Sequence, residues 1–88
     1  MNNREIAKVF KILGNERRFL IVGHLFRAKE LTVGQISELI QLSFRSTSKH
    51  LHVLADMDLL AIKQVSLNKF YSINRSKFPT QLTKFFTN

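Results

Sequence analysis

The sequence predicts a mainly helical fold with a small β-hairpin, in the order helix-helix-helix-helix-strand-strand-helix. Apolar residues recur at helical spacing through most of residues 4–57. Two segments rich in β-branched and aromatic residues, 59–65 and 69–74, then flank a short turn, which is typical of a hairpin. Three glycines and one proline among 88 residues are too few to separate two domains, so we expect one domain over residues 1–88.

The first two predicted helices meet at Gly14, which ends the first of them. Residues 4–13 place four apolar side chains on one helical face. These are Ile6, Val9, Phe10 and Leu13. Asn15 is a good N-cap for the second helix, about 16–28, and Glu16 lies in its first turn. Apolar residues are so frequent in the second segment that we expect a mostly buried central helix.

A pair of closely spaced helices is predicted after a short extended connector at 30–33. The first covers about 33–41, and Ser43 caps the second, which covers about 44–57. The residues expected to face the core are Ile36, Leu39 and Ile40 in the first, and Thr47, Leu51, Leu54 and Met57 in the second. Helices joined by only a couple of residues are typical of a helix-turn-helix, which we place at about 33–57.

A hairpin directly after this pair makes the fold a winged helix-turn-helix, with the wing at about 59–74. Its turn is expected at 66–68, because Asn68 tolerates a positive φ. Residues 77–87 are predicted to form a short last helix with Pro79 near its start. The apolar face of this helix comprises Phe78, Leu82, Phe85 and Phe86.

Basic residues outnumber acidic ones by 14 to 6, which gives a formal net charge of +8. No acidic residue follows Asp58, although several basic residues do. These are Lys63, Lys69, Arg75, Lys77 and Lys84. A one-sided basic excess favours a polyanionic partner such as nucleic acid, although a solvated basic surface is the alternative explanation.

Cysteine is absent, which excludes disulfide bonds and thiolate metal sites and fits a reducing compartment. No apolar run approaches the length of a membrane span. Charged residues interrupt the N-terminal apolar segment, which would be continuous in a signal peptide. We therefore expect a cytoplasmic location. A chain of this length buries little apolar surface by itself, so we also expect a homo-oligomer.

The predicted helix at 44–57 carries a polar and basic face opposite its leucines. A major groove admits one helix, and residues near the N-terminus of that helix reach the base edges. Arginine donates two hydrogen bonds to guanine, serine serves either kind of base, and an aromatic ring touches a thymine methyl group. The expected base contacts are Phe44, Arg45, Ser46, Ser48 and Lys49. The alternative is an exposed helix rich in small residues, but helix propensity does not favour so many serines.

Three groups of residues follow one another in the order and spacing of a known family. They are Leu13-Gly14 with Arg18, then Leu42-Ser43 with Ser48-Lys49-His50-Leu51, then Phe70-Tyr71-Ser72-Ile73. Over about residues 6–73 the chain resembles the ArsR-type winged helix-turn-helix transcriptional repressors. The resemblance implies a homodimeric regulator that presents two recognition helices to an inverted-repeat operator. We expect contacts to the DNA backbone from Arg18, Ser43, His50, Lys63 and Lys69.

The family dimerises through its first and last helices, and the resemblance implies the same interface here. The residues concerned are Ile6, Val9, Phe10, Leu13, Phe78, Leu82, Phe85 and Phe86. The last helix is in any case too apolar to remain in water. The alternative is that these side chains belong to the core of a single chain.

Several positions depart from the pattern of the family. Thr32 stands where metal-sensing members have a cysteine, and Gln35 stands near another ligand position, so we expect no metal sensing and no cofactor. His50 and His52 point to different sides of their helix and cannot share one ion. The wing turn lacks the Gly and Arg that are frequent in the family. Asp58 replaces a glycine at the end of the recognition helix, where left-handed geometry would strain it.

Function classes other than sequence-specific regulation are kept as alternatives. A non-specific architectural DNA-binding protein would show no preference for an operator. A basic module could instead bind acidic protein partners or an anionic membrane surface. An enzyme is not expected, because there is no glycine-rich phosphate loop and Ser48 and His50 face apart. A repressor could also respond to an unknown protein or small-molecule effector.

Overall fold

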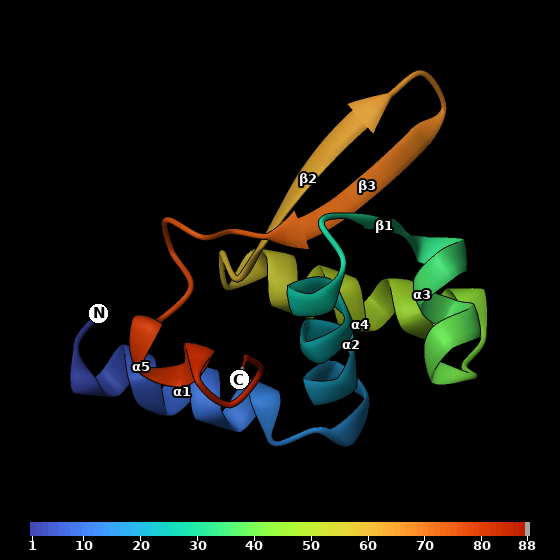
Figure 1. Ribbon diagram of the computed structural model, residues 1–88. Coiled ribbons are helices and arrows are strands. Elements are labelled where there is room, and N and C mark those ends of the chain that lie inside the picture. Colours follow the sequence, from blue (N-terminus) through green and yellow to red (C-terminus); the bar gives the residue numbers. More distant parts are fainter. Residues whose placement is uncertain (88) are drawn as a thin grey trace.

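In residues 1–87, which the computed structural model describes, five helices and three strands surround one apolar core (Figure 1). Their bounds are α1 Asn3–Leu13, α2 Glu16–Arg27, β1 Leu31–Thr32, α3 Val33–Ile40, α4 Phe44–Asp56, β2 Leu60–Val65, β3 Asn68–Ile73 and α5 Thr80–Thr83. The predicted winged helix-turn-helix is confirmed, with α3 and α4 as the helix pair and β2 and β3 as the wing. The last residue of the predicted domain, Asn88, lies outside the described residues.

The first four helices all begin at a side chain that caps the backbone. Asn2 forms a capping box at the start of α1, and Thr32 forms another at the start of α3. Asn15 accepts a hydrogen bond from the backbone N–H of Arg18 in α2 at 3.1 Å. Ser43 caps α4 in the same way by accepting from the N–H of Ser46 at 3.1 Å. These caps satisfy N–H groups that a helix start otherwise leaves free, which is why the helices begin where the sequence predicts.

Both helices of the helix-turn-helix end at a residue with positive φ. Gln41 follows α3 with φ 53°, and Asp58 follows α4 with φ 60°. After α4, the N–H of Leu59 donates to the carbonyl of Leu54 at 3.0 Å, while that of Asp58 donates to Ala55 at 2.9 Å. This pattern is the Schellman motif, which glycine forms most easily at the left-handed position. The expected strain at Asp58 is therefore present in the backbone.

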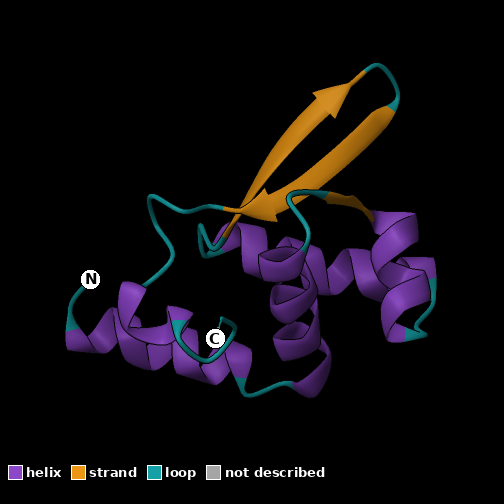
Figure 2. Ribbon diagram, viewed as in Figure 1, coloured by secondary structure: helices purple, strands orange, loops and turns teal. Residues whose placement is uncertain are grey.

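The wing is an antiparallel hairpin whose second strand also pairs with β1, so that the sheet order is β1-β3-β2. The extended connector predicted before α3 thus becomes a short third strand, with Leu31 opposite Tyr71. The predicted turn is wrong by one residue. Asn68 pairs with Val65, and the positive φ of 57° falls on Ser66 instead. A two-residue loop is enough to close this register. The hairpin projects away from the helices (Figure 2).

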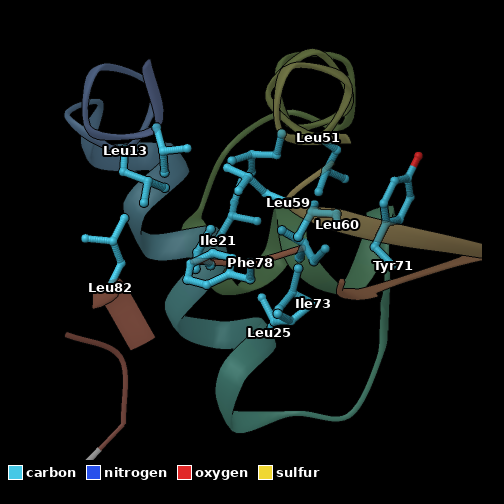
Figure 3. Close-up of a cluster of buried hydrophobic side chains, with 14 of the residues drawn as sticks. Leu13, Ile21, Leu25, Leu51, Leu59, Leu60, Tyr71, Ile73, Phe78 and Leu82 are labelled. Atoms are coloured by element: carbon cyan, nitrogen blue, oxygen red, sulfur yellow. The ribbon is translucent and has the colours of Figure 1, made fainter. Parts of the chain in front are cut away.

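The core is built from side chains of the helices, the base of the wing and the C-terminal segment. Figure 3 shows Leu13 of α1 beside Leu82 of α5 at one end of this cluster and Tyr71 at the other. Leu39 was predicted to be buried but is 50% exposed. Ile36 and Ile40 lie four residues apart and form the buried stripe of α3, whereas Leu39 lies on its flank. Within the described residues, no helix combines the length and the apolar character needed to cross a membrane.

The C-terminal segment is less helical than the sequence predicts. A helix was expected over 77–87, but the structure has only the single turn of α5, Thr80–Thr83. In this segment the packing of aromatic side chains outweighs the helical periodicity of the sequence. The Phe86 ring lies 4.7 Å from the Phe19 ring and 5.3 Å from the Phe26 ring, both of α2. The chain reaches these rings through tight turns after α5 rather than through a continued helix.

We predict that Asp58→Gly stabilises the protein. Glycine adopts the left-handed conformation without the steric cost that a side chain adds, so we expect a gain of about 0.5–1 kcal/mol in the free energy of unfolding. Urea unfolding followed by circular dichroism measures it. As a control, Ala55→Gly inside α4 should lower stability by about 1 kcal/mol. Unchanged or reduced stability of Asp58→Gly would show that the turn is relaxed.

Candidate nucleic-acid interface

One face of α4 is fully buried and the opposite face is open to solvent. Thr47, Leu51 and Leu54 are completely removed from water. Arg45 and Lys49, four residues apart on the other side, are exposed. Charged side chains that project from a helix fixed in this way can reach a surface outside the protein.

The N-terminal end of α4 adds an aromatic ring and small hydroxyl groups to this face. Phe44 is 63% exposed, although it is a large apolar residue. Ser46 and Ser48 are half-buried on the two flanks of the exposed face. Ser43 is exposed, and its hydroxyl oxygen accepts the capping hydrogen bond, so its O–H can still donate to a phosphate oxygen. His52, which we did not include among the predicted contacts, is exposed beside Arg45 and Lys49; its helical spacing from them was the available signal.

A cluster of basic side chains joins the start of α2 to α4. His50 is half-buried, and burial together with the positive charges of Arg18 and Arg17 lowers its pKa below the usual 6.5. The Nε of Arg18 is buried and has no hydrogen-bond partner among the described residues. Like charges held together in this way, with one donor unsatisfied, form a local site suited to an anion.

Arg17 is a structural residue of this region that the sequence analysis missed. Its Nη1 donates to the carbonyl of Ile40 at 2.6 Å and also lies 3.5 Å from the carbonyl of Gln41. A cation at the C-terminus of α3 satisfies carbonyls that the helix leaves free and interacts favourably with the helix dipole. Arg17 therefore ties α2 to the turn that sets the position of α4. The sequence offers no specific signal for this contact, because its partners are backbone atoms 23 and 24 residues away.

The two predicted backbone-contacting lysines of the wing lie on opposite faces of the hairpin. Residues directly opposite each other share a face, and Lys69 is opposite Gln64, whereas Lys63 is opposite Phe70. Lys63 forms an exposed ion pair with Glu30 at 3.2 Å. Lys69 lines a surface hollow together with Phe44 of α4. Only Lys69 is therefore placed beside the exposed end of α4.

The residues predicted for a dimer interface divide into three sets by burial. Four of them are buried within the single chain: Val9, Leu13, Phe78 and Leu82. Phe10 and Phe85 remain 53% and 58% exposed, and they line an apolar hollow of about 170 Å³ between α1, the start of α2 and the C-terminal segment. Ile6 and Phe86 are partly buried. The alternative of an intramolecular core thus holds for the first set, and the exposed set is available to a partner.

Thr32 and Gln35 form hydrogen bonds with each other at the start of α3. Gln35 Oε1 accepts from the backbone N–H of Thr32 at 2.9 Å, and Thr32 Oγ1 accepts from the N–H of Gln35 at 3.2 Å. This capping box starts α3. Among the described residues, no group of three or more His, Cys, Asp or Glu side chains is arranged to hold a metal ion.

Comparison with known proteins identifies the class of this chain. No protein-family model matches the sequence. A relative from Bacillus subtilis (strain 168), the uncharacterized HTH-type transcriptional regulator YceK, is 31% identical over 80 residues, which cover 90% of this chain and 80% of the relative.

Solved structures of transcription regulators share the fold. HlyU from Vibrio cholerae N16961 is 26% identical with a TM-score of 0.80, covering 98% of this chain and 90% of HlyU. The transcriptional repressor PagR of Bacillus anthracis is 25% identical with a TM-score of 0.77, covering 94% and 90% of the two chains. The homodimeric winged helix-turn-helix DNA-binding domain of Mb0332 from Mycobacterium bovis, a possible ArsR-family regulator, is 23% identical with a TM-score of 0.75, covering 94% and 72%.

The relative supplies the family, and the solved structures supply the fold that the sequence predicts. The relative and PagR are both named as transcription regulators. The chain belongs to the helix-turn-helix transcriptional regulators, and it has the winged helix-turn-helix fold that the Mb0332 domain also has.

Proposed function

We propose that the chain is a cytoplasmic, homodimeric repressor that reads an inverted-repeat operator through α4 and responds to no metal ion. One observation carries this proposal: α4 buries Thr47, Leu51 and Leu54 completely and leaves Arg45 and Lys49 exposed on its opposite face. A helix with one face packed into the core and a basic opposite face fits a major groove.

The proposed base contacts are Phe44, Arg45, Ser46, Ser48 and Lys49. Arg45 is the main candidate, because it is exposed near the N-terminus of α4, and a guanidinium group can bind guanine with two hydrogen bonds. Phe44, beside it, presents an exposed ring that suits a thymine methyl group. Asp56 is at the other end of α4, so its repulsion of phosphates acts far from the proposed contacts.

The proposed backbone contacts differ in strength. The half-buried cluster of Arg18 and His50 supports a phosphate contact, because no ion pair within the described residues neutralises Arg18. Within the described residues no ion pair involves Lys69, which lies beside Phe44. Lys63 contributes less, since it is already paired with Glu30 and lies on the other face of the wing.

The proposed dimer forms around Phe10 and Phe85. Their exposed rings and the apolar hollow that they line would be covered by a second copy. The homodimeric state given for Mb0332, which shares the fold, supports this arrangement. Two copies related by a two-fold axis would place two α4 helices on successive half-sites of an inverted repeat.

The function is tested by fluorescence-anisotropy titration of the protein with a duplex selected from a random-sequence library, beside a scrambled duplex, at several salt concentrations. We expect steep salt dependence for both duplexes and tighter binding to the selected one. Equal affinities would support the architectural alternative. No binding at low salt would contradict a nucleic-acid function and point to acidic protein partners.

In the same assay we predict that Arg45→Ala loses sequence preference. The lost base contact should cost about 1–3 kcal/mol on the selected duplex and much less on the scrambled one. Lys69→Ala is the contrasting variant, because loss of a phosphate contact should weaken both duplexes alike and reduce the salt slope by about 1. Lys63→Ala serves as its control and should change little. An equal loss on both duplexes for Arg45→Ala would remove its base-reading role.

We further predict that DNA binding strengthens as the pH falls. Burial and, after it, the charges of Arg18 and Arg17 lower the pKa of free His50, and a phosphate brought by DNA would offset the repulsion by the arginines, so the complex takes up a proton. Affinity should rise as the pH falls from about 8 to about 6.5, and His50→Gln should reduce this rise. The lowered folded-state pKa also reduces fold stability below pH 6.5, so more acidic conditions are avoided. His24→Gln is the control and should keep the rise.

For the dimer, we predict that Phe85→Asp shifts the protein towards monomer. A carboxylate at the centre of an apolar interface should cost about 2 kcal/mol or more of association free energy. Sedimentation equilibrium measures the change. Leu39→Asp is the matched control, because Leu39 is similarly exposed, at 50%, on α3, away from the proposed interface. A dimer that survives Phe85→Asp but not Leu39→Asp would move the interface to α3.

A further inference from the structure

A second hollow lies between α2 and the C-terminal segment, which runs back beside this helix (Figure 1). Its volume is about 400 Å³, against about 170 Å³ for the hollow at Phe10. Pockets for drug-sized ligands have volumes of roughly 300–1,000 Å³, so only the larger of these two hollows has room for such a ligand.

Four phenylalanines line this hollow. Phe19 and Phe26 belong to α2, and Phe85 and Phe86 belong to the C-terminal segment. The Phe86 ring stacks on that of Phe26 with 4° between their planes, and it is tilted by 41° against that of Phe19. Phe19 and Phe85 are nevertheless 41% and 58% exposed. Exposed rings beside a stacked pair favour a flat aromatic ligand, which can stack on them in turn.

Arg27 supplies a positive charge to the same hollow. Its Nη2 lies 3.3 Å from Nδ1 of His24 and donates to it, because a guanidinium group can only donate. Burial and, after it, the charge of Arg27 lower the pKa of His24, so the imidazole stays neutral and accepts this bond. Within residues 1–87 no ion pair involves Arg27, and Glu30 is already paired with Lys63. The other N–H groups of Arg27 can therefore bind a carboxylate.

Gly23 lines the hollow from the middle of α2. Glycine inside a helix is destabilising relative to alanine, and no described glycine has the positive φ that would require it. A Cβ at this position would lie 3.5 Å from Nη1 of Arg27, which is an ordinary contact, so packing does not require glycine either. Space for a ligand gives this glycine a reason that folding does not.

We propose that this hollow binds an aromatic carboxylate, with the aromatic rings against the phenylalanines and the carboxylate on Arg27. The site goes beyond the proposed function, since none of its residues belongs to the proposed nucleic-acid interface. Phe85 and Phe86 line both this hollow and the smaller one at the proposed dimer contact, so a second copy of the chain is the competing occupant.

The probe is 2-naphthoate, and 2-naphthamide is its neutral analogue of the same shape. Calorimetry on the full chain measures both affinities. Amide NMR spectra locate the bound probe, because Gly23 lines this hollow and Gly14 lines the smaller one. We expect 2-naphthoate to shift the Gly23 resonance and to bind about fivefold more tightly than 2-naphthamide, which is the upper range for a charge pair at an exposed site.

The variant Arg27→Gln should weaken binding of 2-naphthoate about fivefold and leave that of 2-naphthamide unchanged. Arg75→Gln is the matched control, because Arg75 is also exposed and lies 5.2 Å from the centroid of the Phe26 ring, but outside the hollow. It removes the same charge and should keep the preference. Gly23→Leu should abolish binding of both probes by filling the hollow. Leucine favours a helix more than glycine does, and a thermal melt checks the fold.

The proposal is supported if the preference for 2-naphthoate and the Gly23 shift are lost in Arg27→Gln and kept in Arg75→Gln. Equal affinities of the wild-type protein for the two probes would overturn it, as would a preference that survives Arg27→Gln. No binding of either probe at about 1 mM would overturn it as well.

Two further outcomes would identify another occupant or another site and would also overturn the proposal. A probe that shifts Gly14 instead of Gly23 binds in the smaller hollow. A Gly23 resonance that moves on dilution of the protein, and not with the probe, shows that a second copy fills the larger hollow. Because no DNA is used, each of these results is independent of the test of the proposed function.

Discussion

The burial of one stripe of α4 is the constraint on which the DNA-binding surface depends. Thr47, Leu51 and Leu54 have no contact with solvent, and their packing fixes the rotation of the helix about its own axis. Truncating one such leucine to alanine typically costs about 2–5 kcal/mol, a large part of the total stability of a small domain. Because this rotation is fixed, Arg45 and Lys49 can only point outward. Specific recognition thus depends on the core as much as on the exposed residues.

Two further contacts fix where α4 begins. Arg17 holds the carbonyls at the end of α3, and the turn from Gln41 to Ser43 then leads directly into the cap of α4. Thr32 acts at the other end of α3, where it is both the last residue of β1 and the N-cap of the helix. Since β1 pairs with β3, the base of the wing and the helix-turn-helix move together. The relative position of α4 and the wing is therefore set by hydrogen bonds at both ends of α3 that join segments distant in the sequence.

Most of the fold was predictable because its determinants are local. Capping residues such as Asn15 and Ser43, and apolar side chains at helical spacing, gave the first four helices nearly to the residue. The errors arose where distant parts of the chain decide the outcome. Phe86 packs on α2, which shortens the last helix. The pairing of β3 with β1 was not predicted, because a segment of two residues carries no pattern that indicates its partner strand. At the site, exposure of Arg45 and Phe44 followed from periodicity, whereas the contact of Arg17 with backbone carbonyls did not.

The arrangement of charge explains why a protein with net charge +8 can still read a sequence. Basic groups attract any duplex, and their contribution falls as salt screens it. Discrimination must come from groups whose contribution depends on the base, and the groups that we propose for it are Phe44, Arg45, Ser46, Ser48 and Lys49 of α4.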